Sequence, residues 1–167
     1  ARIIAVAALR YFLERYARNT LIAFDFKEAL SFEGETGPYV QYAVVRADNI
    51  FRKLEEAGGS SEIHWRLADT SSLSRFLTSS DDIWELVMLS ARLADVVRQV
   101  AQSLEVSQLA KYAFSLAQKF NLFYHKHHIL SEPDEDRKLN LLFVVDLVRK
   151  QLTKALDLLG CEVPPKM

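Results

Sequence analysis

The sequence has 167 residues, of which 50% are hydrophobic and 26% charged, a composition typical of a globular domain with a substantial core. Its five glycines and four prolines are too few for a disordered chain and favour helices over an all-β fold. No apolar run reaches the roughly 18 residues that a membrane-spanning helix needs, so we expect no membrane partner. The net charge of −1 argues against binding nucleic acid through bulk electrostatics, so any such contact should be local.

The first 18 residues are typical of an amphipathic helix, because arginines interrupt the apolar residues and no cleavage-site pattern follows. The candidates for its buried side are Ile3, Ile4, Ala7, Ala8, Tyr11 and Leu13. The chain begins inside this helical pattern, so we expect it to be the C-terminal piece of a longer protein. Residues 21–26 are ambiguous, since Phe24 and Phe26 alternate like a strand whereas residues 27–30 can continue as a helix.

The stretch from Gly34 to Lys53 predicts the central helix. Thr36 and Gly37 can cap it, Pro38 suits a first helical position, and Gly58-Gly59 mark the end. At about 100° per residue, one apolar stripe contains Val40, Ala43, Ala47, Ile50, Phe51 and Leu54. Next to it, over roughly a quarter of the circumference, lie Tyr39, Tyr42, Arg46, Asn49 and Lys53.

This second strip offers stacking rings, a guanidinium and an amide on one rigid surface, which suits unpaired bases on a phosphate backbone. Two other interpretations stay open from the spacing alone. The tyrosines can be half-buried rim residues beside a solvated edge, or the strip can be a protein–protein hot spot, where Tyr and Arg are also favoured.

Residues 58–80 are serine-rich and aperiodic, and predict a loop-rich insertion with room for one short extra helix. Residues 81–102 predict one long helix, capped by Ser79 or Ser80 and opened by acidic residues. The buried stripe expected of that helix is Ile83, Leu86, Val87, Ser90, Leu93, Ala94, Val97 and Ala101.

The next predicted helix starts at Ser107 and ends in a basic and aromatic cluster, Lys119 to His128. We reject a zinc site here, because His125 and His128 have no cysteine or carboxylate at ligand spacing. The cluster is either a patch that lies near RNA or a solvated helix end. Tyr124, on the buried stripe, can equally be a core tyrosine with its hydroxyl at the surface.

The last predicted helix begins at Ser131-Glu132-Pro133 with an acidic first turn, and Gly160 ends it. The two prolines after Cys161 predict an extended tail. A single cysteine excludes an intrachain disulfide and fits a reducing, cytoplasmic setting.

The residue order from Gly34 to Arg46, GxTGPYVQYAxxR, closely resembles the helix that opens the anticodon-binding region of arginyl-tRNA synthetases, which are class I enzymes. The pairs Phe120-Asn121 and Phe123-Tyr124 and the tail from LLG to Met167 resemble the same family. The local motif at Asp136, Arg137, Lys138 and Leu139 departs from the family's Asp-Ala-Leu-Arg pattern.

The resemblance implies an all-α helical bundle over residues 1–167, with the tRNA for arginine as partner. It implies that Tyr39, Tyr42, Arg46 and Tyr124 contact the anticodon, with Asn49 and Lys53 on the same strip and Met167 closing the pocket. The anticodon domain of another class I synthetase, such as the cysteine enzyme, is an alternative.

The chain shows no glycine-rich phosphate loop, no His-x-Gly-His motif and no paired cysteines. We therefore expect it to be catalytically inactive alone and to need no cofactor. The resemblance implies that the full-length protein is an arginine–tRNA ligase, that ATP and Mg²⁺ bind in an upstream catalytic domain, and that the protein is a monomer.

Overall fold

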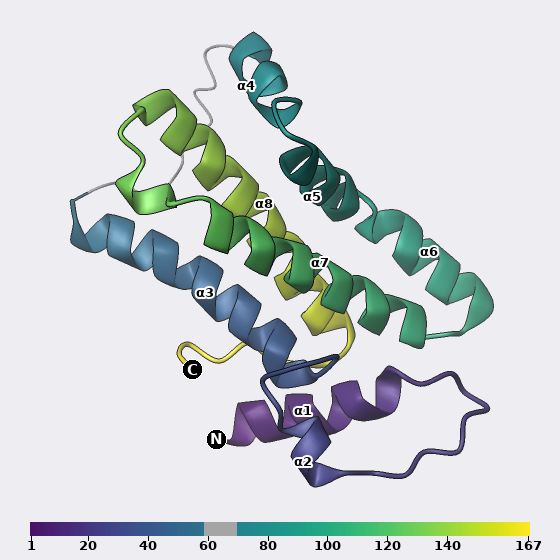
Figure 1. The fold of residues 1–167 in the computed structure, drawn as a ribbon. Coiled ribbons are helices and arrows are strands. Elements are labelled where there is room, and N and C mark those ends of the chain that lie inside the picture. Colours follow the sequence, from purple (N-terminus) through teal and green to yellow (C-terminus); the bar gives the residue numbers. More distant parts are fainter. Residues whose placement is uncertain (59–69) are drawn as a thin grey trace.

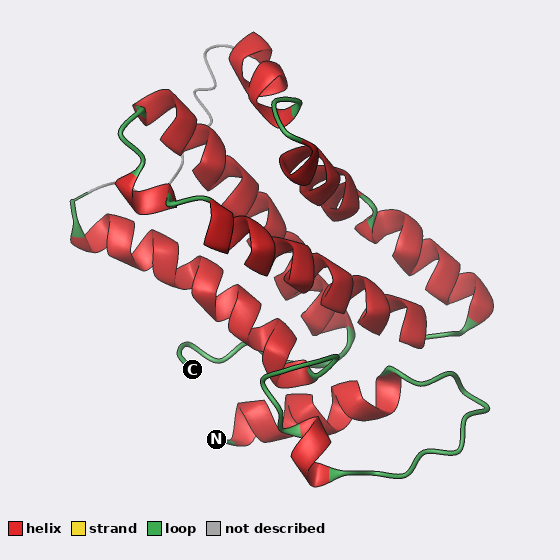
Figure 2. Cartoon of the chain, in the orientation of Figure 1, coloured by secondary structure: helices red, strands yellow, loops and turns green. Residues whose placement is uncertain are grey.

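A computed structural model of the chain describes residues 1–58 and 70–167, and within these residues the structure is all helical, with no strand (Figure 2). This confirms the predicted fold class. The elements are α1 (Arg2–Glu14), α2 (Phe26–Ala29), α3 (Gly37–Glu56), α4 (Thr70–Leu77), α5 (Asp81–Ala91), α6 (Leu93–Ser103), α7 (Ser107–Lys126), the 3₁₀ turn η1 (Ile129–Ser131) and α8 (Glu135–Leu158). None of the described helices is both long enough and apolar enough to cross a bilayer.

Three long helices, α3, α7 and α8, pack against one another, while α5 and α6 lie along α7 and α1 packs on α3 (Figure 1). Their contact faces bury Ile83, Leu86, Leu116, Phe120, Leu141, Leu142, Leu152 and Leu156. The Tyr11 hydroxyl donates a buried hydrogen bond of 2.7 Å to the Ala110 carbonyl and so ties α1 to α7. Burial raises the pKa of this phenol far above its usual range, which keeps the hydroxyl a donor.

The start of α3 lies where the sequence predicts it, at Thr36 and Gly37. Thr36 is the N-cap, and its Oγ1 accepts from the Tyr39 amide at 3.2 Å. A Cβ on Gly37 would lie 2.5 Å from the Ala7 carbonyl oxygen, so only glycine lets α3 begin this close to α1. Gly58, with φ of +81°, follows the last turn as predicted, and Gly59 lies outside the described residues.

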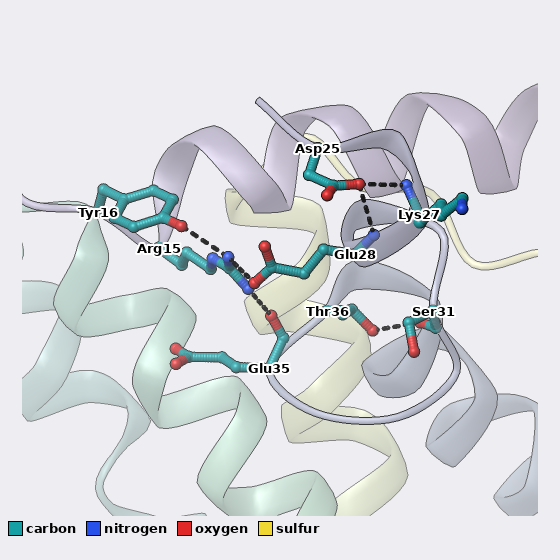
Figure 3. A network of polar contacts seen from close by, with 8 residues as sticks. All are labelled: Arg15, Tyr16, Asp25, Lys27, Glu28, Ser31, Glu35 and Thr36. Atoms are coloured by element: carbon teal, nitrogen blue, oxygen red, sulfur yellow. Dashed lines mark hydrogen bonds and ion pairs between the residues drawn. The ribbon is translucent and has the colours of Figure 1, made fainter. Parts of the chain in front are cut away.

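The N-terminal predictions need two corrections. Helix α1 ends at Glu14, and Leu13 is exposed while Phe12 takes the buried position. The strand interpretation of residues 21–26 is wrong, because the Asp25 carboxylate accepts from the amides of Lys27 (2.7 Å) and Glu28 (3.2 Å) and so caps α2 (Figure 3).

The single helix predicted over residues 81–102 is wrong as well. The chain breaks at Arg92, whose amide bonds the Leu89 carbonyl three residues back, so the last turn of α5 tightens. The break changes the buried face of α6, which buries Leu93 and Val96 and leaves the predicted Ala94 and Ala101 exposed.

One further boundary, the start of α8, differs from the prediction. Asp134 rather than Ser131 caps α8, by accepting from the amides of Asp136 (3.0 Å) and Arg137 (3.1 Å). In the stretch 58–80, for which the sequence analysis left room for one short extra helix, residues 70–77 form α4, and residues 59–69 lie outside the described part. Gly160, with φ of +64°, follows the end of α8 as predicted.

Candidate nucleic-acid interface

The Arg46 side chain is the centre of a polar and aromatic cluster between α3 and α7. Its guanidinium carbon lies 4.7 Å from the ring centroid of Tyr42 and 4.7 Å from that of Tyr124. Nη1 donates to Asn121 Oδ1 at 3.0 Å, and Nη2 donates to the Tyr42 hydroxyl at 3.2 Å. His125 Nε2 lies 3.4 Å from Nη1. These five residues are called the Arg46 cluster below.

The packing of two helices places these side chains together. Val40, Ala43 and Ala47 are buried on the face of α3 that packs in the core. On α7, Ala117 and Phe120 are buried in the same core. The residues that border these two buried faces, among them the Arg46 cluster, therefore meet where α3 packs on α7. The spacing of Tyr42 and Arg46 by four residues puts both on one edge of α3.

The rings of the cluster keep part of their surface in solvent. Tyr42 is 36% exposed, and Tyr124 is half-buried against the Phe120 ring, whose centroid is 6.4 Å away. Tyr39 is also half-buried and packs on Phe114 at 5.4 Å. The tyrosines are therefore half-buried rim residues that support the core and still present polar edges to solvent. Two of the interpretations of the strip, a surface for unpaired bases and a rim beside the core, thus each describe part of what the structure shows.

Two predicted site residues lie farther along the same strip. Asn49 Oδ1 accepts from Nε (3.3 Å) and Nη2 (3.1 Å) of Arg52, and Lys53 is exposed one turn beyond Asn49. Within the described residues, no hydrogen bond joins either one to Arg46. Their part in the interface stays a prediction.

Met167 belongs to a tail that is fixed on the other flank of α3. Gln41, which is fully buried, donates from Nε2 to the Glu162 carbonyl at 2.6 Å. On the helix, Gln41 lies about 140° around from Arg46. Pro164 is buried and Met167 half-buried, and in Figure 1 the tail passes α3 before it reaches the C-terminus. The role of Met167 as a pocket wall stays a prediction.

Sequence reasoning did not assign a site role to Phe32, although its ring lies 6.3 Å from that of Tyr42 and 52% of the residue is exposed. Phe32 precedes α3 in an irregular segment, where no periodicity marks a surface position. Asn121 and His125 fall in the predicted cluster from Lys119 to His128 but received no site role of their own. The spacing of Asn121 from Tyr124, three residues, and from His125, four residues, was the available signal.

A second surface, the groove between α1, α8 and the tail, carries several cations that pair within the protein. Arg149 contacts Asp48 at 3.3 Å and Asp146 at 2.8 Å, and Lys154 contacts Asp157 at 3.2 Å. These two cations are therefore paired within the protein, and the described residues that line the groove lack the aromatic rings of the Arg46 cluster, which makes that cluster the better candidate for holding unpaired bases.

An all-helical bundle with an exposed cluster of tyrosine, arginine and asparagine is the kind of domain that holds unpaired bases, and the family comparison agrees. The model of the DALR anticodon binding domain family matches residues 40–167, and the chain belongs to this family. Relatives with similar sequences are arginine–tRNA ligases. That of Pyrococcus furiosus is 36% identical and that of Clostridium botulinum (strain Alaska E43 / Type E3) 38% identical, each over 167 residues.

The chain spans only about a quarter of these relatives, 26% and 28% of their lengths, while all of it is matched. The arginyl-tRNA synthetase of Thermus thermophilus superposes with a TM-score of 0.74 at 29% identity, over 99% of this chain and 27% of that one. That of Plasmodium falciparum superposes with a TM-score of 0.77 at 22% identity, over 99% and 27% of the two chains, and shows the shared fold.

Proposed function

We propose that this chain binds the anticodon loop of an arginine tRNA through the Arg46 cluster, as the anticodon-binding part of an arginine–tRNA ligase. The observation that carries the proposal is the guanidinium of Arg46 between two partly exposed phenol rings. Membership of an anticodon-binding family and relatives named arginine–tRNA ligase support it.

The chemistry of the cluster suits a single-stranded loop. Tyrosine rings stack on bases of any sequence, at ~1–3 kcal/mol per base, while the hydroxyl and the Asn121 amide can bond base edges. Arg46 adds a planar donor that pairs with a base edge or a phosphate. Because the net charge of the chain is −1, the affinity of this domain should come from these few contacts rather than from a broad basic surface.

The remaining steps of the ligase reaction would be carried out by the part of a ligase that this chain does not span, about three quarters of the relatives' length. Activation of arginine with ATP and Mg²⁺ would take place there. Within the described residues, no group of three or more His, Cys, Asp or Glu is placed to hold a metal ion. We also propose a monomer in the cytoplasm, where the single buried thiol of Cys161 would stay reduced.

The test is binding of an RNA hairpin that carries the anticodon stem and loop of an arginine tRNA. Tyr42→Ala should weaken binding on the order of tenfold, because one stacking surface is lost, and should leave the helical circular dichroism unchanged. Tyr16→Ala is the matched control, since Tyr16 is a half-buried tyrosine whose hydroxyl accepts from Arg15 and whose ring packs on Phe12.

Two further measurements separate RNA recognition from the protein-docking alternative. Binding should weaken as salt is added, and a hairpin with a changed anticodon should bind more weakly. Wild-type affinity in Tyr42→Ala, or equal affinity for both hairpins, would contradict the proposal.

A further inference from the structure

We propose that Phe32 is a second stacking platform, which holds the unpaired base next to the one bound at the Arg46 cluster. This inference rests on the proposed function and extends it to a residue outside the α3 and α7 strips.

Each phenol ring inside the cluster has one face covered by the Arg46 guanidinium. The Arg46 guanidinium lies over Tyr42 and over Tyr124, and Tyr124 also meets Phe120 and the edge of His125. Of the aromatic side chains along this surface (Phe32, Tyr39, Tyr42, Tyr124), Phe32 has the largest exposed fraction, 52% against 36% for Tyr42, while the other two are half-buried.

The orientation of Phe32 leaves a face open for a base. Its plane makes an angle of 89° with that of Tyr42, at a centroid distance of 6.3 Å. In a perpendicular pair a ring has at most one face covered by its partner, so Phe32 keeps at least one face that Tyr42 does not cover. A base on that face would lie within reach of its neighbour at Tyr42, as consecutive bases of one strand require.

The segment around Phe32 is held in place before any ligand binds. Thr36 Oγ1 donates to the Ser31 carbonyl at 2.6 Å, and the Glu33 amide donates to Ser31 Oγ at 3.0 Å. Arg15 Nη1, reaching from beyond the end of α1, donates to the Glu35 carbonyl at 2.8 Å (Figure 3). An exposed phenylalanine on a segment fixed at both ends loses little conformational freedom on stacking, which favours binding.

Phe32 is separate from the other exposed phenylalanines of this region. Phe24 and Phe26 contact each other at 4.7 Å, and Phe24 packs at 4.9 Å on Phe12, which is buried in α1. The ring contact of Phe32 is with Tyr42 instead, which places Phe32 beside the Arg46 cluster that is proposed to bind RNA.

The experiment measures binding of the 167-residue chain to the same anticodon hairpin. Phe32→Ala and Phe32→Leu should both weaken binding roughly fivefold or more, because leucine keeps the apolar volume but has no ring face. Phe32→Tyr should keep wild-type affinity. Phe26→Ala removes an even more exposed ring, 72%, from the other chain of contacts, and it should bind as wild type.

A second measurement reads the position of the base directly. Hairpins with 5-iodouridine at successive loop positions are irradiated in the complex, and the crosslinked residue is found by mass spectrometry. One loop position should crosslink to Phe32, and this product should be absent from Phe32→Leu.

The outcomes separate the two proposals. If Tyr42→Ala weakens binding while Phe32→Leu binds as wild type and no crosslink reaches residue 32, the second platform is overturned and the proposed function stands. If Phe32→Leu keeps wild-type affinity and Phe32→Ala does not, Phe32 makes an apolar contact only, and stacking is overturned. If the wild type shows no anticodon-dependent binding, both proposals fall.

Discussion

Gln41 and Tyr42 are neighbours in the sequence, yet they lie about 100° apart around α3 and do different things. Gln41 is 0% exposed and holds the C-terminal tail through the Glu162 carbonyl. Tyr42 is 36% exposed and holds Arg46 at the surface. One flank therefore builds the fold and the other presents side chains to solvent.

The comparison teaches that a short motif mixes two kinds of residue. In the stretch from Gly34 to Arg46, Thr36 caps the helix, Gly37 permits contact with α1 and Gln41 fixes the tail, whereas Tyr42 and Arg46 lie in the candidate interface. A match to the whole stretch does not separate the two kinds of residue. The burial of each side chain and its hydrogen-bond partners in the structure do separate them.

The largest expected effect is on the flank that builds the fold. Gly37→Ala should destabilise the chain by about 1–3 kcal/mol, because the new Cβ would meet the Ala7 carbonyl oxygen at 2.5 Å and force α1 and α3 apart. Urea denaturation followed by circular dichroism measures it. RNA affinity, measured where both proteins are folded, should change far less than in Tyr42→Ala. An unchanged urea midpoint would show that the helices separate without cost.

A smaller effect is expected at Gln41. Gln41→Ala removes the donor to the Glu162 carbonyl and should cost about 1 kcal/mol for the hydrogen bond, with a further loss from the space left behind. Gln41→Met keeps the volume, so the difference between the two variants isolates the packing contribution. The tail should also become a better substrate for carboxypeptidase.

The same variants test the predicted role of Met167. If the tail completes the RNA site, loosening it in Gln41→Met should weaken hairpin binding along with stability. If binding stays at the wild-type level while the tail is cleaved faster, the two flanks are independent and Met167 is no part of the pocket.

The smallest effect on stability is expected at Arg46. Arg46→Lys should change the free energy of unfolding by less than about 0.5 kcal/mol, as for most surface changes. RNA affinity should still fall about tenfold, since an ammonium cannot bond Asn121 and Tyr42 in one plane between two rings. Arg98→Lys, at an exposed arginine of α6 that pairs with Asp95, is the control and should alter neither quantity. A large loss of stability in Arg46→Lys would make the cluster a structural element instead.

The fold was largely predictable because helical periodicity and caps are local. The stripe of α3, its start at Thr36 and the end of α8 before Gly160 all follow from nearest neighbours in the sequence. The break at Arg92 was not predictable, since neither glycine nor proline stands there and the apolar spacing continues through it. The Asp25 cap was hidden because Phe24 and Phe26 alternate like a strand.

The site was predictable in part for the same reason. Tyr42 and Arg46 share one helix edge, which spacing alone reveals. That Arg46 meets Asn121, 75 residues away, depends on how α3 and α7 pack, and no local pattern contains that register. Phe32 was missed because it stands in a non-helical segment, where its neighbours in sequence say little about its neighbours in space.

The contacts of Arg46 have a consequence for the entropy of recognition. A free arginine side chain gives up about 2 kcal/mol of rotamer freedom when it is immobilised. Here two rings, an amide and a hydroxyl immobilise it when the chain folds, so that loss is not repeated when RNA arrives. Any substitution in the hydrophobic seam that slides α3 along α7 would return this freedom to the side chain, and so would weaken recognition from inside the core.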